Sequence, residues 1–277
     1  MDKFVTKTRK KTLESPDEKK NKIVEVACQS GQVKRRWLES NFKDNASLFA
    51  TEEDEEEEDK DFAHALSWKK IEAEGLDCDY TLLFRKSEAD IILKELEQEV
   101  EYFSGDLAKV HVFGKLHNIP RRQATYGDPG LKYTFSGLQL SARPWTPTLV
   151  MIRDRVTEAT GHSFNFVLIN RYKDGNDHIG EHRDDERELD SASPIASVSF
   201  GASREFVFRH CSSRGKKASR KIEPVRIELQ HGSLLLMNWP TNVYWYHSLP
   251  VRKKVLLPRV NLTFRKIVGL KKTQKTS

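Results

Sequence analysis

The stretch HIGEHRDDE, residues 178–186, places two histidines and four acidic residues within nine positions. Imidazole and carboxylate groups bind metal ions and exchange protons, so this density predicts either a reactive site or a solvated, charged loop. Side chains alternate between the two faces of an extended segment, so His182 and Asp184 would point to the same side. Together they could offer one nitrogen and one oxygen to a single metal ion.

A third ligand is needed, and His247 in the segment NVYWYHSLP is the candidate. Two histidines and one carboxylate on one face of a metal form the facial triad of non-haem Fe(II) oxygenases, which leaves the opposite face open. A zinc-protease-like pair of His178 and His182 at helical spacing is an alternative, although Gly180 and the lack of helical periodicity argue against it. Unrelated surface or core histidines are a third interpretation.

A second polar cluster lies in RVNLTFR, residues 259–265. Strand alternation would place Arg259, Asn261, Thr263 and Arg265 on one face and three apolar residues on the other. Two arginines on one face of a buried sheet are costly unless they meet anions, and a dicarboxylate would satisfy both. The segment INRY offers Asn170 and Tyr172 as further donors. A solvent-facing strand with alternating charge is the alternative.

The elements around these residues change along the chain from helices to strands. The pattern predicts a helix over 86–103 with Ser87 as N-cap, and a second over 146–161 with Pro147 in its first turn and Gly161 beyond its end. Strand-like segments follow at 163–172, 196–210, 232–238 and 259–268, and residues 209–224 form a basic loop or hairpin tip. This order favours an α+β fold with a sandwich or jelly roll.

Charge is unevenly distributed. The net charge is +6, but residues 1–60 hold 13 Lys+Arg against 15 Asp+Glu. This leaves +8 for the remainder and suggests a polyanionic partner, nucleic acid or anionic membrane.

Residues 1–66 are expected to be a disordered charged tail. Three isolated cysteines indicate reduced thiols. With no secretory signal and no apolar run of ~20 residues, a soluble protein is expected.

The order of motifs, NRYKDGNDHIGEHRDDE, then His247, then RVNLTFR, resembles the AlkB family of Fe(II)/2-oxoglutarate-dependent nucleic-acid dealkylases. The resemblance covers about residues 67–268, and within the family it is greatest to the nuclear homologue that acts on double-stranded DNA. It implies a double-stranded β-helix (jelly-roll) core with N-terminal helices. It also implies a nucleotide-recognition lid at about 105–140, between the charged tail 1–66 and a basic C-terminal tail, 269–277.

The resemblance also implies residue roles. His182, Asp184 and His247 would bind Fe(II) and form the catalytic centre, and 2-oxoglutarate would be bound by Asn170, Tyr172, Arg259, Thr263 and Arg265. The substrate would be held by Val112, Phe113, Gly114, Arg121, Tyr133, Phe135, Ser136, Asp185, Glu186, Arg252, Lys253 and Lys254. In that set Phe113 would fill the gap left by a flipped base, Phe135 would stack on the base, and residues 252–254 would grip phosphates.

The activity so implied is oxidative demethylation of 1-methyladenine and 3-methylcytosine in DNA, preferably duplex DNA. It would consume O2 and 2-oxoglutarate and release formaldehyde and succinate. The expected protein is a nuclear monomer without membrane contact. KFVTK, residues Lys3–Lys7, would bind the sliding clamp PCNA, although Thr6 stands where that motif has an aliphatic residue. The acidic run 52–59 has no counterpart in the family pattern. A dioxygenase of RNA or single-stranded DNA and a non-catalytic DNA-binding module are the alternatives.

Overall fold

The computed structural model describes residues 66–268, except 113, 136–137 and 216–217. The predicted disordered tail, the clamp-binding motif, the acidic run, Phe113, Ser136 and residues 269–277 lie outside the described residues. Within the described part, no helix is long and apolar enough to cross a membrane.

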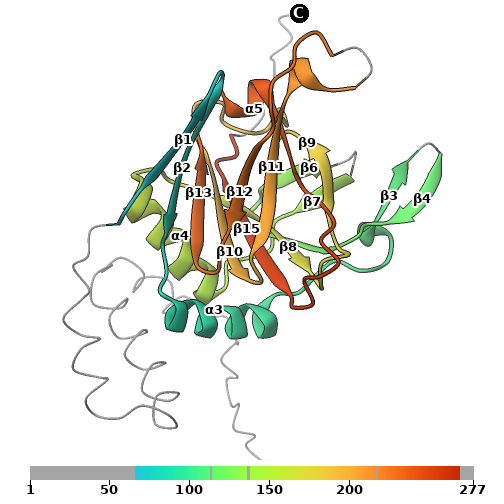
Figure 1. Cartoon of the computed structure of the whole chain (residues 1–277). Helices are drawn as coiled ribbons and strands as arrows, with labels where there is room; N and C mark the ends of the chain where they lie inside the picture. The colour runs from blue at the N-terminus through green and yellow to red at the C-terminus, as the bar shows by residue number, and fades with distance from the viewer. Residues whose placement is uncertain (1–65, 113, 136–137, 216–217, 269–277) are drawn as a thin grey trace, which may run out of the picture. The chain divides into compact units, whose positions relative to one another are not determined.

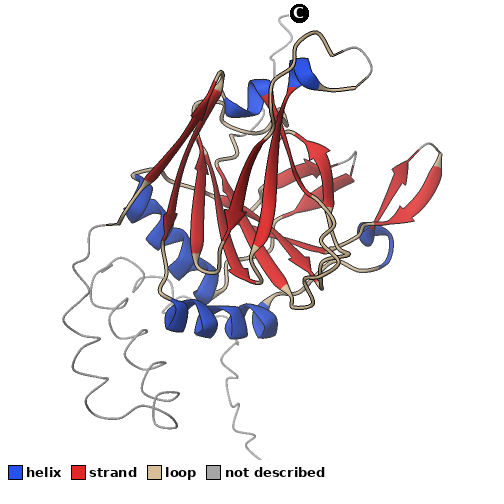
Figure 2. Ribbon diagram, viewed as in Figure 1, coloured by secondary structure: helices blue, strands red, loops and turns tan. Residues whose placement is uncertain are grey.

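Two antiparallel sheets face each other and form the body of this region (Figure 1, Figure 2). The larger sheet has the order β1 (Lys69–Ala73), β2 (Leu76–Leu82), β13 (Ser233–Met237), β10 (Ile195–Gly201), β15 (Arg259–Arg265), β8 (Phe166–Tyr172) and β5 (Arg122–Gly127). The smaller sheet has the order β12 (Val225–Leu229), β11 (Arg204–His210), β14 (Trp245–Leu249) and β9 (Ile179–His182). Apart from the pairs β1–β2 and β11–β12, neighbouring strands in these sheets are not consecutive in sequence, as in a jelly roll, so the predicted fold class is confirmed.

The helices pack on the face of the larger sheet that points away from the smaller one. They are α3 (Lys86–Glu99) and α4 (Pro147–Thr160), with the short α5 (Thr241–Tyr244) and the 3₁₀ turns η3 (Gly105–Ala108) and η4 (Cys211–Ser213) elsewhere. The predicted limits of α4 are confirmed: Thr146 caps it by accepting from the Leu149 amide at 3.3 Å, and Gly161 ends it at φ 73°.

Helix α3 differs from its prediction at both ends. Arg85, not Ser87, is the N-cap, and it makes no side-chain hydrogen bond. The helix ends at Glu99 instead of residue 103, because Val100 is already extended and the Phe103 amide donates to the Gln123 carbonyl at 2.7 Å. Pairing with β5 therefore outweighs continued helical hydrogen bonding. The strand-like segment 196–210 is likewise two strands in different sheets, with a turn at Gly201 (φ 86°).

Two apolar layers enclose the larger sheet. On the helix side, Val260, Leu262 and Phe264 of β15 pack with α3 and α4, while a second cluster lies between the sheets. The alternate residues of β15 consequently point into the space between the sheets, and Arg259 and Arg265 are only 2 % and 3 % exposed. The solvent-facing alternative for this strand is therefore wrong.

Two hairpins extend from this body. The strands β3 (Lys109–Val112) and β4 (Lys115–Asn118) form an arm that projects away from the sheets in Figure 1. The turn between them contains Gly114 at φ 74°, a conformation that favours glycine. The second hairpin, β6 (Lys132–Phe135) and β7 (Leu138–Ser141), packs Tyr133 against Phe166 of β8. Both fall within the segment predicted as the recognition lid, whose limits stay a prediction.

Candidate metal and co-substrate site

The three predicted metal ligands come together at the β9 edge of the smaller sheet. His182 ends β9, Asp184 follows two residues later, and His247 on the neighbouring β14 is the register partner of His182. One ligand atom from each of the three lies within 4.8 Å of the others. The helical His178–His182 pair is excluded because β9 is a strand.

The protonation states of these groups suit a metal ion. The pKa of His247 is lowered to about 3, first by burial and then by the neighbouring His182, so its imidazole is neutral. Burial opposes ionisation of Asp184, but the cationic Arg265, which also donates a hydrogen bond to it, lowers its pKa to about 2. His182 Nδ1 lies 2.9 Å from the Gly180 carbonyl and donates to it as neutral imidazole, which leaves Nε2 facing Asp184. Neutral imidazole and ionised carboxylate are the forms that bind metals.

Arg265 lies between the predicted metal ligand Asp184 and Tyr133, which is predicted to contact the substrate. Its Nη2 lies 3.0 Å from Asp184 Oδ1, and its guanidinium lies over the Tyr133 ring at 5.3 Å. Burial lowers the pKa of Arg265, but Asp184, Tyr133 and Glu186 together raise it above the ordinary arginine value, so the residue is cationic. Its Nε and Nη1 are buried without a hydrogen-bond partner. A bound carboxylate would satisfy these donors.

Arg259 is a second buried cation, and its environment differs. Its Nη2 donates to Ser199 Oγ at 2.9 Å and its guanidinium lies 5.4 Å from the Tyr172 ring centre, but Nε has no partner. No carboxylate among the described residues forms an ion pair with it. Burial therefore lowers the pKa of Arg259 to about 10. An uncompensated buried guanidinium requires an anion, which is what the distal carboxylate of a dicarboxylate supplies.

A narrow internal cavity connects these groups. Its lining combines the metal ligands, Arg265 and the predicted co-substrate residues Asn170, Tyr172 and Thr263. Arg259 is not in the lining but contacts it through Tyr172. Both the metal and 2-oxoglutarate thus fit this donor set: three ligands, two buried cations and unpartnered N–H groups.

The residues predicted to contact DNA differ in their exposure and in their partners, and they do not form a single cluster as the metal ligands do. Tyr133 donates a short hydrogen bond to Glu186, whereas Asp185 is exposed and pairs with Arg183 at 3.0 Å. Arg121 is buried and donates to Asn170 Oδ1 at 2.8 Å. The side chains of Val112 and Phe135 lie outside the described residues, although their backbones belong to β3 and β6.

The basic segment 252–254 likewise contains both an ion-paired residue and exposed residues. Arg252 pairs with Glu205, to which its Nε donates at 3.0 Å, while Lys253 and Lys254 are exposed. The two lysines are thus open to an anion, and Arg252 is already neutralised. All the DNA-binding roles of these residues stay predictions.

Sequence reasoning missed one buried charge next to the site. Arg204 is 2 % exposed, and its guanidinium donates to the carbonyls of Asp174, Asp177 and Pro250 at 3.2, 3.0 and 2.9 Å. It ties the loop before β9 to the loop after β14, the two strands that carry the histidines. The only sequence signal is an arginine at the start of the strand REFVFRH, which does not distinguish a buried from an exposed side chain.

The sequence of this chain is similar to those of known proteins. The model of the 2OG-Fe(II) oxygenase superfamily matches residues 80–265. DNA oxidative demethylase ALKBH2 of Bos taurus is 72 % identical over 203 residues, which cover 73 % of each chain. Alpha-ketoglutarate-dependent dioxygenase alkB homolog 3 of Homo sapiens is 36 % identical over 192 residues, covering 69 % of this chain and 65 % of that protein. A solved structure, "The structure of OsALKBH1", aligns with 72 % of this chain at 15 % identity and a TM-score of 0.48.

The matched region contains every metal and co-substrate residue described above. Fe(II) is the metal and 2-oxoglutarate the co-substrate of enzymes with this domain, and the site supplies ligands for both. The chain belongs to the 2OG-Fe(II) oxygenase superfamily and, within it, to the AlkB family.

Proposed function

We propose that this chain is a DNA oxidative demethylase that restores N-alkylated bases such as 1-methyladenine and 3-methylcytosine by direct reversal. The observation that carries the proposal is the triad His182, Asp184 and His247 beside two buried arginines, each of which has at least one N–H donor without a partner. The high identity to proteins named DNA oxidative demethylase ALKBH2 supports DNA as the substrate. Fe(II) held by His182, Asp184 and His247, together with 2-oxoglutarate and O2, would supply the oxidising power for hydroxylation of the N-alkyl carbon, with succinate, CO2 and formaldehyde as the other products.

The residues of the chain contribute positioning and charge. Asp184 and the two histidines hold the metal, and Arg265 with Arg259 orients the two ends of 2-oxoglutarate. Glu186, held by Tyr133, lies beside Arg265 and close to the metal ligands. A lesion such as 1-methyladenine is cationic, so a carboxylate there favours the damaged base over the neutral normal base. Such a base also costs less to extrude, because alkylation at the pairing edge removes its pairing.

We propose duplex DNA as the preferred form of the substrate. The β3–β4 arm projects from the sheets, as a segment that inserts between base pairs must. Lys253 and Lys254 are exposed and form no ion pair among the described residues, so they can bind phosphates, whereas we assign Arg252 to shaping that loop. Loss of both lysines should weaken binding to every duplex sequence and flatten its salt dependence.

Succinate release and base repair, measured in the same reaction, test the function. Wild type and Asp184→Ala are incubated with Fe(II), 2-oxoglutarate and either a duplex or a single strand containing one 1-methyladenine. We expect repair and matching succinate with the duplex from wild type and neither from the variant. Repair of the single strand alone would refute the duplex preference and favour the single-strand or RNA alternative. Succinate without repair of either DNA would refute DNA as the substrate, and no succinate at all would favour a binding module.

The remaining proposals concern the whole chain. We propose a nuclear, monomeric enzyme whose catalytic region is 67–268, with a lid at about 105–140 and charged tails at 1–66 and 269–277. We propose that Lys3–Lys7 binds the sliding clamp PCNA. Fluorescence of tagged chains with the basic clusters at 7–11 and 34–36 neutralised tests the location, and a pull-down with Phe4→Ala tests the clamp.

A further inference from the structure

The outer face of the smaller sheet carries a cluster of charged and aromatic side chains directly behind the metal ligands. Glu181 and Arg183 flank His182, and Tyr246 precedes His247. Because side chains alternate along a strand, these three point away from the metal while the histidines point toward it. Arg209 on β11 is the register partner of Tyr246 and completes the row across three strands.

The contacts within this cluster are short. Glu181 accepts from Arg209 Nε at 2.7 Å through one carboxylate oxygen and from Arg214 Nε at 2.8 Å through the other. The Tyr246 ring has Arg214 at 3.5 Å and Arg183 at 4.8 Å from its centre. We call these five residues, Glu181, Arg183, Arg209, Arg214 and Tyr246, the Glu181 clasp.

Within the smaller sheet, the strand that the clasp holds is paired on one side only. β9 is at the edge of the smaller sheet and pairs only with β14, where the register shifts between His247 and Leu249. The hydrogen bond that orients His182 runs from its Nδ1 to the Gly180 carbonyl, so it spans Glu181. Any movement of Glu181 therefore moves both the ligand and the group that fixes its tautomer.

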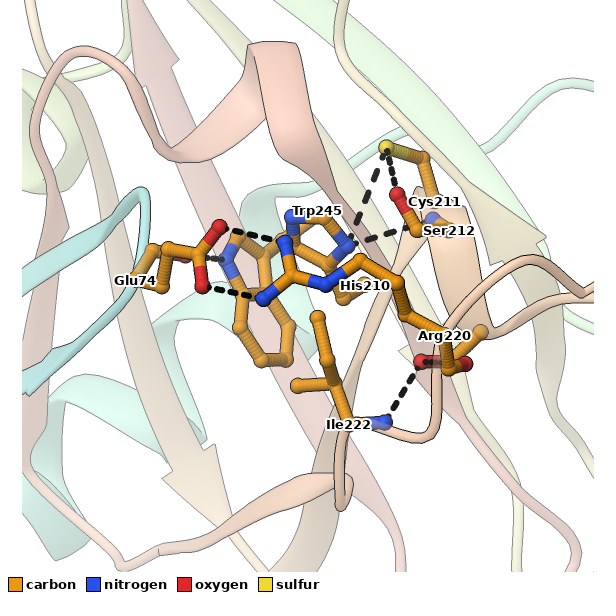
Figure 3. Close-up of polar contacts among 8 residues, drawn as sticks. Glu74, His210, Cys211, Ser212, Arg220, Ile222 and Trp245 are labelled. Carbon is orange, nitrogen blue, oxygen red and sulfur yellow. Dashed lines mark hydrogen bonds and ion pairs between the residues drawn. The ribbon is translucent and has the colours of Figure 1, made fainter.

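The opposite end of the clasp is itself anchored. Arg214 follows η4, where the Ser212 amide donates to His210 Nδ1 at 3.1 Å. Farther along the same loop, Arg220 makes a bidentate pair with Glu74, with distances of 2.6 and 2.7 Å (Figure 3). These contacts hold the β11–β12 loop at His210 and at Arg220, and they fix the backbone that carries Arg214.

We propose that Glu181 is a positioning residue for the metal centre: clamped by Arg209 and Arg214, it sets the place of His182 on an otherwise weakly paired strand. The inference rests on the proposed ligand role of His182, Asp184 and His247. Partly exposed ion pairs contribute little to overall stability, so the clasp acts on local geometry. The side chains of Arg209 and Glu181 are 36 % and 32 % exposed, which places the clasp in this class.

Metal affinity, measured without turnover, tests the proposal. Co(II) alone is titrated into the metal-free full chain and followed by its visible absorption, for wild type, Glu181→Gln, Arg214→Ala and Asp184→Ala. Glu181→Gln keeps the shape but loses the charge, and we expect its affinity to fall about tenfold, the lower end for residues outside the ligand shell. Arg214→Ala should weaken binding in the same direction, and thermal midpoints should hardly change.

The matched control is Glu205→Gln. Glu205 lies on β11 of the same sheet and also forms ion pairs with two arginines, Arg226 and Arg252, but it is not next to a metal ligand in the sequence. Its Co(II) affinity should equal that of wild type. Glu181→Gln within twofold of wild type, or an equal loss in Glu205→Gln, would overturn the inference. If Asp184→Ala binds Co(II) as wild type does, the ligand assignment itself fails, and the inference fails with it.

Discussion

The substitution Arg259→Met is expected to raise the stability of the protein and at the same time to abolish its binding of 2-oxoglutarate. Arg259 is buried beside Tyr172 and Ser199 without a carboxylate partner among the described residues. Methionine is unbranched and apolar and can fill much of the same space. Replacing an uncompensated buried charge by an apolar side chain of similar volume is commonly neutral or stabilising.

The magnitude follows from the pKa of Arg259, which burial lowers well below the ordinary arginine value, to about 10. At about 1.4 kcal/mol per pH unit, the folded protein disfavours the cation by roughly 3 kcal/mol. The side chain is protonated in both the folded and unfolded states at neutral pH, so this cost applies in full. Loss of the hydrogen bond to Ser199 removes about 1 kcal/mol. A net gain of about 1–2 kcal/mol corresponds to a rise of roughly 2–8 °C in the thermal midpoint.

Thermal unfolding with and without 2-oxoglutarate, in the presence of a divalent metal, measures both effects. Ligand at 100 times its Kd should stabilise wild type by about 2.7 kcal/mol and leave the variant nearly unchanged. Arg226→Met, an exposed arginine on β12, is the control and should respond to 2-oxoglutarate like wild type. A variant that is less stable than wild type without ligand, or that is stabilised by 2-oxoglutarate to the same extent, would refute the reasoning.

Three further changes probe other parts of the structure. A Cβ on Gly175 would lie 1.8 Å from the Arg252 carbonyl oxygen, so Gly175→Ala should displace the basic segment 252–254. In a fluorescence anisotropy titration, duplex binding should weaken, while 2-oxoglutarate still binds. Tyr133→Phe removes a hydrogen bond from the partly buried Glu186, and kcat/KM for a cationic lesion should fall by about tenfold, with DNA affinity little changed. Thr146→Ala removes the α4 cap and should cost about 1 kcal/mol in a denaturant titration without reducing activity.

Local patterns in the sequence predicted the parts of the structure that depend on local physics. Helix α4 has Thr146 as cap, Pro147 in the first turn and Gly161 in the left-handed conformation at its end. The alternation in RVNLTFR likewise identified the polar face of β15, because every second residue of a strand meets the same environment. These features are set by backbone geometry within a few residues, so no knowledge of the tertiary contacts was needed.

Features that depend on distant contacts were not predictable in this way. The end of α3 is decided by a hydrogen bond from Phe103 to β5, and the burial of Arg204 by three carbonyl oxygens from two loops. The Glu181 clasp requires a loop residue, Arg214, to return to the sheet 33 positions away. Each side chain alone is typical of a solvated surface, and only the fold shows what it contacts.

The density of charge in HIGEHRDDE has a structural reason once the two faces of β9 are distinguished. His182 and Asp184 point inward, where Asp184 is 7 % exposed, while Glu181 and Arg183 point outward to Arg209, Arg214 and Tyr246. A strand at the edge of a sheet has few backbone bonds to fix a metal ligand, so polar side chains on its outer face must do part of that work. A solvated loop would need neither the alternation nor the buried carboxylate, and the stretch has both.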